Sequence, residues 1–395
     1  MINEATWQYI EGHLHEDVRQ LALRGWKDEA VDLPMALQQI QGRQLAEAKL
    51  PTWAAVKRLV YPPHLSLEQC SSELTARYKA GVASSLEGDK DLMVDLTGGL
   101  GVDFYWMSKV FGHAVYVEQQ PQLHDIAKAN FAILGLQAGT VLGEATDYLR
   151  RMDHASVIFV DPARRNAAGG RTYDISDCSP NVLLMLDDLL SKGSHVMLKL
   201  SPMLDWQKAV SDVGKGHVRQ VHIVSVRNDC KELLLVLDAH SDGDTRLFCV
   251  NDDSCEEFIL TGHHTDGQQA YWKEELEGAW LYEPNASLMK AGLFDELAHR
   301  YHVLPLARNS HLFLSKQTVG NFPGRCFRIF AVAKMNKREL RQTIMPLCQA
   351  NISVRNFPMT VAELRLRLKL REGGSNYLFA TTLAYGEKVL IVARR

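Results

Sequence analysis

Apolar runs separated by polar turns dominate the middle of the chain and predict buried strands. Residues 157–160 are apolar throughout, which is typical of a strand buried on both faces of a parallel sheet. A similar run ends at Val94, and others lie at residues 114–117, 140–142 and 195–200. Between them, apolar residues return with helical spacing at 104–111 and 123–134. This alternation predicts a doubly wound α/β fold with a Rossmann-like parallel sheet.

Two further apolar runs, 222–227 and 233–237, are separated by the short polar stretch 228–232. This spacing predicts an antiparallel strand pair at the end of the parallel sheet. We therefore predict an α/β domain at residues 86–240 with a seven-stranded sheet.

The N-terminal part, residues 1–85, has helical spacing interrupted by prolines at 51, 62 and 63. A capping box at residues 66–69 predicts a helix over 69–82. This helix either closes over a bound ligand or is an amphipathic surface helix. Its polar candidates are Gln69, Ser72, Thr75 and Lys79.

After residue 240 the pattern changes to alternating strands and short helices, which predicts two small α+β domains, at 241–320 and 321–395. The first has a strand at 246–250 and a helix at 287–299. The second has a helix at 337–347 and strands at 327–332, 352–355, 377–382 and 389–392. Residues 364–371 alternate Leu with Arg or Lys, which is a strand period, but a capping box at 360–363 favours the helix that we predict.

Composition adds limits to this picture. The chain has 395 residues, 46% of them hydrophobic, which suits several domains with substantial cores. Seven cysteines, an odd number without a C-x-x-C pair, predict reduced thiols and neither a disulfide scaffold nor a zinc cluster. The first residues form neither a basic segment nor an apolar run, and no apolar stretch in the chain approaches the roughly 18–20 residues that span a bilayer. We therefore expect a cytoplasmic protein without a membrane partner; the oligomeric state stays open.

The charge of the chain is divided unevenly. Residues 321–395 contain 14 Lys and Arg against four Asp and Glu, a net charge of +10, whereas the other 320 residues carry −13. Such a split predicts that the C-terminal domain meets a polyanion, although a well-solvated basic face is the alternative. The candidate contacts are Arg338, Arg341, Arg355 and Arg365.

The stretch from Asp95 to Asp103, DLTGGLGVD, carries the most chemistry. An apolar strand ends in an acid and runs into a glycine-rich turn, where the absence of Cβ atoms lets the backbone approach a ligand. The dinucleotide fingerprint G-x-G-x-x-G fits poorly, because the chain offers G-G-x-G and places Phe104 where a small residue is needed.

This turn resembles motif I of class I S-adenosylmethionine-dependent methyltransferases. The resemblance implies that Asp95, Thr97 and the amides of Gly98, Gly99 and Gly101 hold the methionyl end of S-adenosylmethionine. Glu118, at the end of the next strand, is placed at the ribose hydroxyls. The segment 143–145 resembles the part of that family that borders the adenine, with Glu144 and then Asp147 as its acids. For Glu118 and Glu144, capping of a loop is the structural alternative.

The segment Asp161 to Arg165, DPARR, follows the buried strand 157–160 and resembles motif IV of amino-methyltransferases. Asp161 is the candidate that orients or deprotonates the acceptor, and Lys199 is a second candidate at a strand end. Arg164 stands where that motif has an aromatic residue, which disfavours methylation of a flipped base. Arg164 and Arg165 either clamp a substrate phosphate or bridge to nearby acids. The segment directly after residues 195–200 is Ser201-Pro202-Met203, which contains no cysteine nucleophile, so covalent pyrimidine chemistry is disfavoured.

Nearly everything after Pro51 resembles a family that joins a class I methyltransferase domain to a ferredoxin-like domain and a C-terminal THUMP-like domain. The resemblance is carried by residues 69–80, 95–103, 161–165, 199–205, 282–285 and 355–358. It implies RNA as the partner but does not name the substrate; our hypothesis is an RNA methyltransferase that acts at nitrogen or ribose oxygen. A non-catalytic RNA-binding protein with a retained pocket and a small-molecule or protein methyltransferase are the alternatives. The pair His263-His264 has no third ligand nearby, so we expect no metal.

Overall fold

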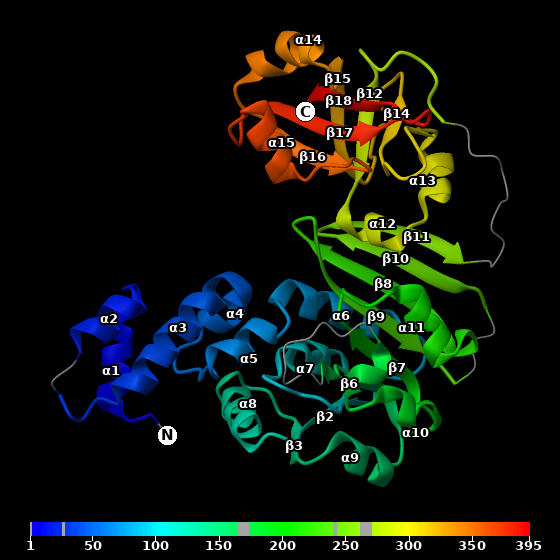
Figure 1. Cartoon of the computed structure of the whole chain (residues 1–395). Coiled ribbons are helices and arrows are strands. Elements are labelled where there is room, and N and C mark those ends of the chain that lie inside the picture. The colour runs from blue at the N-terminus through cyan, green and yellow to red at the C-terminus, as the bar shows by residue number, and fades with distance from the viewer. Residues whose placement is uncertain (1, 26–27, 165–173, 240–242, 261–270) are drawn as a thin grey trace. The chain divides into compact units, whose positions relative to one another are not determined.

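The computed structural model describes residues 2–25, 28–164, 174–239, 243–260 and 271–395 (Figure 1). The chain forms two compact units. Met1–His222 and Glu232–Arg246 make the first, and Ile223–Lys231 and Leu247–Arg395 make the second. Two candidates from the sequence, Arg165 and the pair His263-His264, lie outside the described residues.

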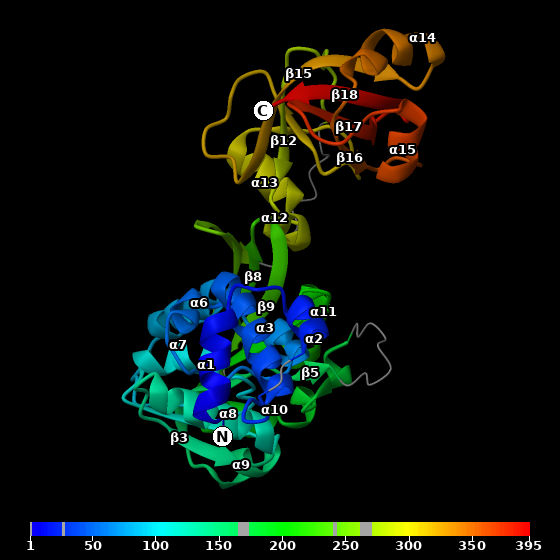
Figure 2. The ribbon, with the colours of Figure 1, turned by 90° about the vertical axis from the view of Figure 1, so that its left-hand side faces the viewer.

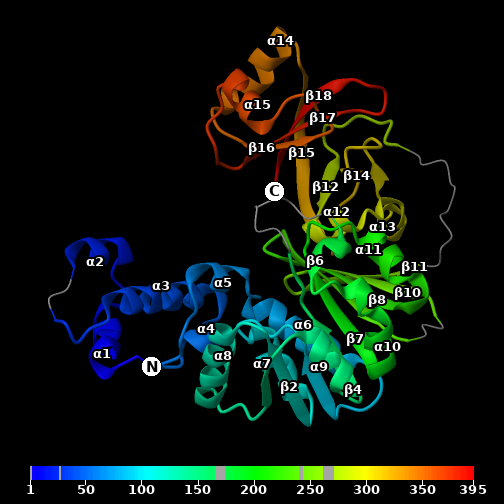
Figure 3. The ribbon, with the colours of Figure 1, turned by 60° about the horizontal axis from the view of Figure 1, so that its bottom comes forward.

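The first unit begins with helices, as the periodicity predicts. Trp7, Ile10, Leu21, Ala36 and Ile40 form a small core between the first three of them. The helices are α1 (Glu4–His13), α2 (Val18–Arg24), α3 (Leu33–Lys49), α4 (Pro51–Ala54), α5 (His64–Gln69) and α6 (Glu73–Ser85), and Figure 3 shows α3 running from α1 and α2 toward α4 and α5.

The helix predicted over residues 69–82 is wrong at its start. The capping box at 66–69 does not form; Ser66 lies inside α5, and its carbonyl accepts the amide of Cys70. The chain is extended at Cys70, and Ser72 then caps α6 by accepting the Thr75 amide. This break places residues 70 and 71 in a connection between two helices rather than inside one.

A nine-stranded sheet follows, in the order β11-β10-β8-β9-β7-β4-β1-β2-β3. Its central strands β2, β1, β4 and β7 are parallel, β3 is parallel to β2, and β9 is antiparallel to β7. This arrangement confirms the predicted Rossmann-like α/β class. The strand predicted at 246–250 as part of the next domain is β10 of this sheet, and β11 is a strand that the sequence did not predict. The strands are β1 (Leu92–Asp95), β2 (His113–Glu118), β3 (Gly139–Leu142), β4 (Ala155–Val160), β7 (Gly193–Leu200), β8 (Val218–Val226), β9 (Asp229–Leu237), β10 (Thr245–Asn251) and β11 (Ser254–Leu260).

Short helices connect these strands. All six positions of β4 are buried, which confirms the burial predicted for the apolar run 157–160. Strand β5 pairs with β6 in a separate two-stranded ribbon. The connecting elements are α7 (Val102–Met107), α8 (Pro121–Ile133), α9 (Ala145–Arg151), α10 (Leu186–Lys192), α11 (Trp206–Val213), β5 (Ala163–Arg164) and β6 (Cys178–Ser179).

Strands β8 and β9 form the predicted hairpin, with a turn at Arg227 and Asn228. Both residues have positive φ, 52° and 59°, as the turns favoured in two-residue hairpins require. Their amides donate to the side chains of Asp252 and Asn251 at 2.8 and 3.0 Å.

The second unit contains a seven-stranded sheet in the order β13-β14-β12-β15-β18-β17-β16. Its strands are β12 (Trp280–Pro284), β13 (Leu304–Pro305), β14 (Phe313–Ser315), β15 (Gly324–Lys334), β16 (Asn351–Arg355), β17 (Asn376–Thr382) and β18 (Lys388–Arg394). The single helix predicted over 287–299 is wrong, because two helices occupy this segment. The first, α12 (Ala286–Ala291), ends at Gly292, which has a φ of 74° that is incompatible with a right-handed helix, and the second is α13 (Phe294–Tyr301).

The predicted helix after the capping box at Thr360 is confirmed as α15 (Val361–Leu368), which lies beside β16 in Figure 2. Leu364 and Leu368, four residues apart, are buried, whereas Leu366 between them is 81% exposed. Burial on one helical face therefore outweighs the strand-like alternation. Upstream, α14 (Lys337–Glu339) continues as a π-turn over Leu340–Ile344 and a 3-10 turn over Met345–Leu347.

Two further findings concern the chain as a whole. In the part that the structure describes, every helix is too short or too polar to cross a membrane. All seven cysteines are described, and none of them forms a disulfide bond.

Candidate functional site

The glycine turn that follows β1 is packed so closely that side chains do not fit. A Cβ atom on Gly98 would lie 2.0 Å from the ring of Tyr116, and one on Gly101 would lie 2.4 Å from the ring of Phe131. Gly101 also has a φ of 82°, a conformation that favours glycine. The turn therefore depends on its glycines to keep its backbone against β2 and α8.

Glu118, at the end of β2, holds the turn in place. Its Oε2 accepts the Gly99 amide at 2.8 Å and its Oε1 accepts the Gln120 amide at 2.7 Å. The Tyr116 hydroxyl donates to the Gly99 carbonyl. Each carboxylate oxygen has a second lone pair, so Glu118 can accept from a ligand as well.

Asp95 ends β1 and is 1% exposed. Its Oδ1 accepts the Thr97 amide at 2.9 Å. Burial raises the pKa of Asp95 well above its usual value; the Thr97 amide lowers it, and the nearby carboxylates of Asp103 and Asp161 raise it further. The ionised form of Asp95 is therefore disfavoured unless a cation lies next to it.

Asp161, immediately after β4, is tied to both neighbouring strands. Its amide donates to Thr97 Oγ1 at 2.6 Å, and its Oδ2 lies 2.5 Å from Lys199 Nζ near the end of β7. Burial lowers the pKa of Lys199, but the carboxylates of Asp161, Asp103 and Glu232 outweigh it, so the pKa rises above its usual value. The two catalytic candidates Asp161 and Lys199 thus form one ion pair with a charged lysine.

A buried network that the sequence did not predict extends from this pair. Lys79, with no exposed surface, contacts Glu232 at 2.6 and 2.7 Å and Asp103 Oδ1 at 3.2 Å. Ser71 Oγ donates to Asp103 Oδ2 at 2.7 Å, and Lys199 Nζ lies 3.8 Å from the same oxygen. Lys79 therefore neither reaches a ligand nor lies on an amphipathic surface; it connects α6 to the sheet and to α7.

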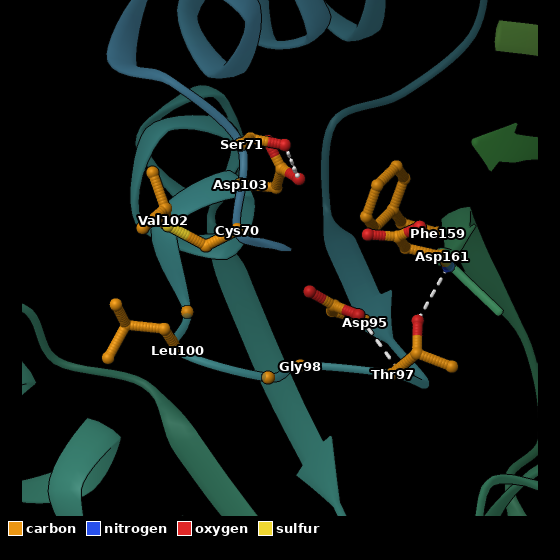
Figure 4. Close-up of a pocket in the computed structure, with 12 residues that line it drawn as sticks. Cys70, Ser71, Asp95, Thr97, Gly98, Leu100, Val102, Asp103, Phe159 and Asp161 are labelled. Carbon is orange, nitrogen blue, oxygen red and sulfur yellow. Dashed lines mark hydrogen bonds between the residues drawn. The ribbon is translucent and has the colours of Figure 1, made fainter. Parts of the chain in front are cut away.

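The glycine turn borders a small pocket with a volume of about 50 Å³. Figure 4 shows Ser71 and Asp103 on one side of it and Asp95, Thr97 and Asp161 on the other. It is lined by Cys70, Ser71, Asp95, Thr97, Gly98, Gly99, Leu100, Gly101, Val102, Asp103, Phe159 and Asp161. Of the residues that the sequence proposes for the site, Asp95, Thr97, the three glycines and Asp161 thus line one pocket.

Cys70 is a lining residue that bears on the chemistry. Burial, the largest cause, raises its pKa to about 11, so the thiol is protonated at neutral pH. A thiol in that state is a weak nucleophile, which agrees with the absence of a cysteine from the catalytic candidates.

The two adenine candidates do not line this pocket. Glu144 begins α9 and is exposed, and the Gln119 side-chain amide, with its nitrogen facing the carboxylate, lies 2.9 and 3.0 Å from the Glu144 oxygens. Asp147 is 61% exposed and lies 3.5 Å from Arg150. Arg164 lies in β5, where it pairs with Cys178 of β6.

The four arginines predicted to contact a substrate lie in the second unit and differ in their surroundings. Arg338 and Arg341 are exposed. Arg365 is half-buried and donates to the Ala350 carbonyl at 3.4 Å. Arg355 is bound internally: its Nη2 lies 2.9 Å from the buried carboxylate of Glu283, which also pairs with Arg325.

No cluster of three or more His, Cys, Asp and Glu with the spacing of a metal site occurs within the described ranges.

Comparison with known proteins identifies the family of the chain. A family model described as THUMP domain-like matches residues 324–395, and one described as a ferredoxin-like domain matches residues 280–323. The structure of a candidate methyltransferase from Porphyromonas gingivalis W83 has 30% sequence identity, a TM-score of 0.87 and full coverage of both chains. The chain belongs to that family. Its members combine a class I methyltransferase fold with ferredoxin-like and THUMP-like domains.

Other solved structures are less similar to this chain. A SAM-dependent methyltransferase from Agrobacterium tumefaciens has 15% identity and a TM-score of 0.32 over 42% of this chain and 61% of its own. A candidate class I methyltransferase from Listeria monocytogenes has 12% identity and a TM-score of 0.40 over 64% and 94%. The comparison with curated proteins gives no match.

Proposed function

We propose that the chain is an S-adenosylmethionine-dependent methyltransferase that acts on RNA, at nitrogen or at ribose oxygen. One observation carries the proposal: the glycine turn, Glu118 and the Asp161–Lys199 pair meet at the carboxyl edge of the parallel strands. Open α/β sheets bind their ligands at that edge. Membership of a family whose relative is a candidate methyltransferase supports the same conclusion.

The residues present suit the donor. The Gly98–Gly101 turn brings its backbone close to the pocket, where Gly98 and Gly101 have no room for a Cβ atom. The amides of Gly98, Gly99 and Gly101 already donate to the Val117 carbonyl, the Glu118 carboxylate and the Gly98 carbonyl, so the turn would shape the wall beside the donor rather than bind it through these three amides. Glu118 has lone pairs left for the ribose hydroxyls, and Asp95 faces the pocket with a carboxylate that a cation would stabilise. Glu144 and Asp147, although outside the small pocket, are our candidates for the adenine end.

Methyl transfer depends on the positioning of donor and acceptor more than on a covalent intermediate with the protein. When bound, the donor supplies a methyl group on a positively charged sulfur, which leaves as a neutral thioether. Asp161 orients the acceptor atom and takes the proton that this atom loses. Lys199 holds the Asp161 carboxylate in place at 2.5 Å through Oδ2, so Oδ1 is the oxygen offered to the acceptor.

RNA as the substrate is supported by the C-terminal unit. The last 75 residues carry a net charge of +10, and the THUMP-like match covers residues 324–395. Arg338 and Arg341 are exposed there and are our first candidates for phosphate contacts. Arg355, which pairs with Glu283, is instead a candidate for holding the domain together.

The proposal is tested by incubating the full chain with labelled S-adenosylmethionine and total RNA from a strain that lacks the protein, followed by nucleoside mass spectrometry. We expect label in one modified nucleoside that the untreated RNA lacks. Donor binding without label in any RNA fraction would favour a non-catalytic RNA-binding protein. Transfer to a protein or small molecule that is insensitive to charge reversal at Arg338 and Arg341 would favour the third alternative.

A further inference from the structure

The second unit contains a cleft far larger than the pocket beside the glycine turn. Its volume is about 510 Å³, which lies within the roughly 300–1,000 Å³ of sites that hold small molecules and cofactors. The turn between β8 and β9, the turn between β10 and β11, the start of α12 and the start of β15 all contribute to it. Its lining includes Arg227, Arg325 and Arg395, together with four asparagines and Phe322.

Arg227 has a backbone conformation that arginine rarely adopts. Its φ is 52°, in the left-handed region, where the turn of a hairpin favours Asn or Gly. The Arg227 amide donates to Asp252 Oδ1 at 2.8 Å, and the Asn228 amide donates to Asn251 Oδ1 at 3.0 Å, so the β10–β11 turn holds the hairpin turn in this conformation. The fold thus keeps a guanidinium group at the cleft although the backbone favours a smaller residue there, which is typical of functional positions.

The two acids among the described lining residues already have hydrogen-bond donors. Glu256 pairs with Arg300 at 2.9 Å through Oε2, and its Oε1 accepts the Tyr301 hydroxyl at 2.6 Å. Asp252 accepts the Arg227 amide on Oδ1, and its Oδ2 lies 3.2 Å from the side-chain nitrogen of Asn251. Neither acid is therefore left as a bare anion that would repel an anionic ligand from the cleft.

The arginines of the lining have fewer acidic partners than they need. Arg325 Nε donates to the buried carboxylate of Glu283 at 2.8 Å, and Arg355 pairs with the same carboxylate at 2.9 Å. Arg227 and Arg395 are exposed, and within the described residues neither forms an ion pair. Among the lining side chains and their ion-pair partners, five guanidinium groups therefore meet three carboxylates, and the cleft favours an anion.

Phe322 provides an aromatic wall beside these charges. The ring is half-buried, and its centroid lies 4.9 Å from that of Tyr282 and 5.3 Å from that of Tyr301, so two further rings support it. Unstacked RNA bases pack on aromatic rings of this kind, and side-chain amides of Asn form hydrogen bonds with base edges. Arginine pairs with phosphate oxygens. The cleft thus combines groups for a base with groups for a phosphate.

We propose that this cleft binds one unpaired nucleotide of the RNA substrate, with its base against Phe322 and a phosphate at Arg227 and Arg395. This inference rests on the proposed function, because it names the part of the RNA that the second unit recognises. An unpaired nucleotide exposes the face and the edge of its base, which a continuous duplex keeps stacked and paired. The cleft therefore adds recognition of a base to the charge attraction of the exposed arginines Arg338 and Arg341.

The test is fluorescence anisotropy of the full chain with two labelled probes over a salt series. One probe is a single-stranded RNA decamer that contains all four bases, and the other is an abasic strand with the same number of phosphates. Because the two strands carry equal charge, the difference between them reports binding of bases alone. We expect the decamer to bind at least about fivefold more tightly than the abasic strand.

Three variants assign this difference to the cleft. Arg227→Ala should weaken binding of the decamer by about three- to tenfold and lower its salt slope by about 0.7, the value for one phosphate contact on a single strand. Phe322→Leu keeps an apolar side chain against Tyr282 and Tyr301 but removes the ring, so decamer and abasic strand should bind within about twofold of each other. Lys231→Ala is the matched control, because this exposed lysine of the same hairpin pairs with Asp229 and lies outside the lining. It should change binding by less than about twofold.

Thermal unfolding of each variant shows that it is folded. Equal binding of decamer and abasic strand by the wild-type chain would overturn the inference, as would an unchanged salt slope in Arg227→Ala. Adenosine monophosphate that binds as tightly as the decamer would overturn it in favour of a free nucleotide. The proposed function stands in all three cases if the wild-type chain methylates total RNA, and absence of that methylation would contradict the proposed function instead.

Discussion

Lys79 and Glu232 lie 153 residues apart in the sequence, and their side chains meet in a fully buried ion pair. The pair joins α6, the last helix before the first strand of the sheet, to β9, which follows about 150 residues later in the chain. Through Asp103 and Lys199 it reaches Asp161. The catalytic candidates therefore depend on a charge network whose members are spread over the whole first unit.

Replacement of Lys79 tests the structural weight of this pair. Lys79→Met should destabilise the chain by about 3–5 kcal/mol, because it leaves the carboxylates of Glu232 and Asp103 buried without their partner. Urea unfolding measures the loss. The double variant Lys79→Met with Glu232→Leu should recover more than half of it, since no charge is then left unpaired at Glu232.

Lys208→Met is the matched control, because the Lys208 side chain is half exposed and pairs with two acids at the surface. It should change stability far less than Lys79→Met. Equal losses in the two variants would show that the buried network carries no special weight.

The role of Asp161 leads to a prediction about kinetics. Asp161→Asn keeps the size of the side chain but cannot accept a proton, so methyl transfer should fall by roughly 10²–10⁴-fold. Donor affinity, measured by calorimetry, should stay within about threefold because Asp95, the turn and Glu118 are unchanged. Asp187→Asn, an exposed acid of α10, serves as control. Full activity of Asp161→Asn would remove Asp161 from the mechanism.

Replacement of glycine by alanine should have opposite effects on stability in the glycine turn and in α6. Gly98→Ala brings a Cβ within 2.0 Å of the Tyr116 ring and should cost stability by about 1–3 kcal/mol and abolish donor binding. Gly81→Ala, on α6, meets nothing within 4 Å and should stabilise the helix by about 0.5–1 kcal/mol. Thermal unfolding and donor titration of both variants test this contrast, and donor binding by Gly98→Ala would contradict the proposed role of the turn.

Much of this site follows from local sequence. The run of apolar residues into Asp95, the spacing of the glycines and the acid Glu118 are all read within a few residues of a strand end, where a parallel sheet gathers its ligand-binding groups. The buried run 157–160 places Asp161 at the same edge for the same reason.

The rest depends on contacts that leave no local pattern. Glu232 reads as a polar residue in a short connection, and only the pairing of β9 with β7 brings it to Lys79. The capping box at residues 66–69 is a good local signal and predicts that Ser71 lies inside a helix; in the structure Ser72 caps α6 instead, so Ser71 precedes the helix. The end of α12 at Gly292 is likewise not visible in the sequence, because the apolar spacing continues through this residue. The positive φ of Gly292 ends the helix.

His195, at the start of β7, predicts a pH dependence of stability. Its Nδ1 contacts Asp238 Oδ1 at 2.5 Å and its Nε2 faces the Glu87 carbonyl at 2.8 Å. The hydrogen bond to Asp238 raises the pKa of His195; burial lowers it, and the Glu87 carbonyl raises it further. Both ring nitrogens therefore favour the protonated imidazole.

Because the folded pKa of His195 is raised, its stabilisation is fully present below the unfolded value of about 6.5 and is lost as pH rises through the folded value. Urea unfolding across this window should show a fall in stability with rising pH that His195→Gln flattens. A fall of the same size in His195→Gln would assign the dependence to another group.

The arginines of the second unit separate binding from stability. Replacing the exposed Arg338 and Arg341 by Ala should weaken RNA binding and reduce its salt dependence by about one to two phosphate contacts, without a change in melting temperature. Arg355→Ala should lower the melting temperature, because Glu283 loses one of its two partners. Filter binding over a salt series, with thermal unfolding of each variant, distinguishes the two roles. An unchanged salt slope in the double variant would place the RNA contacts elsewhere.

The central claim is that the glycine turn and Glu118 hold the methyl donor. A crystal structure of the chain soaked with S-adenosylhomocysteine tests it most directly. We expect the ribose hydroxyls at Glu118 and the methionyl end along Gly98–Gly101, beside Asp95. Ligand bound at a different place, or no ligand at concentrations that saturate related methyltransferases, would contradict the account.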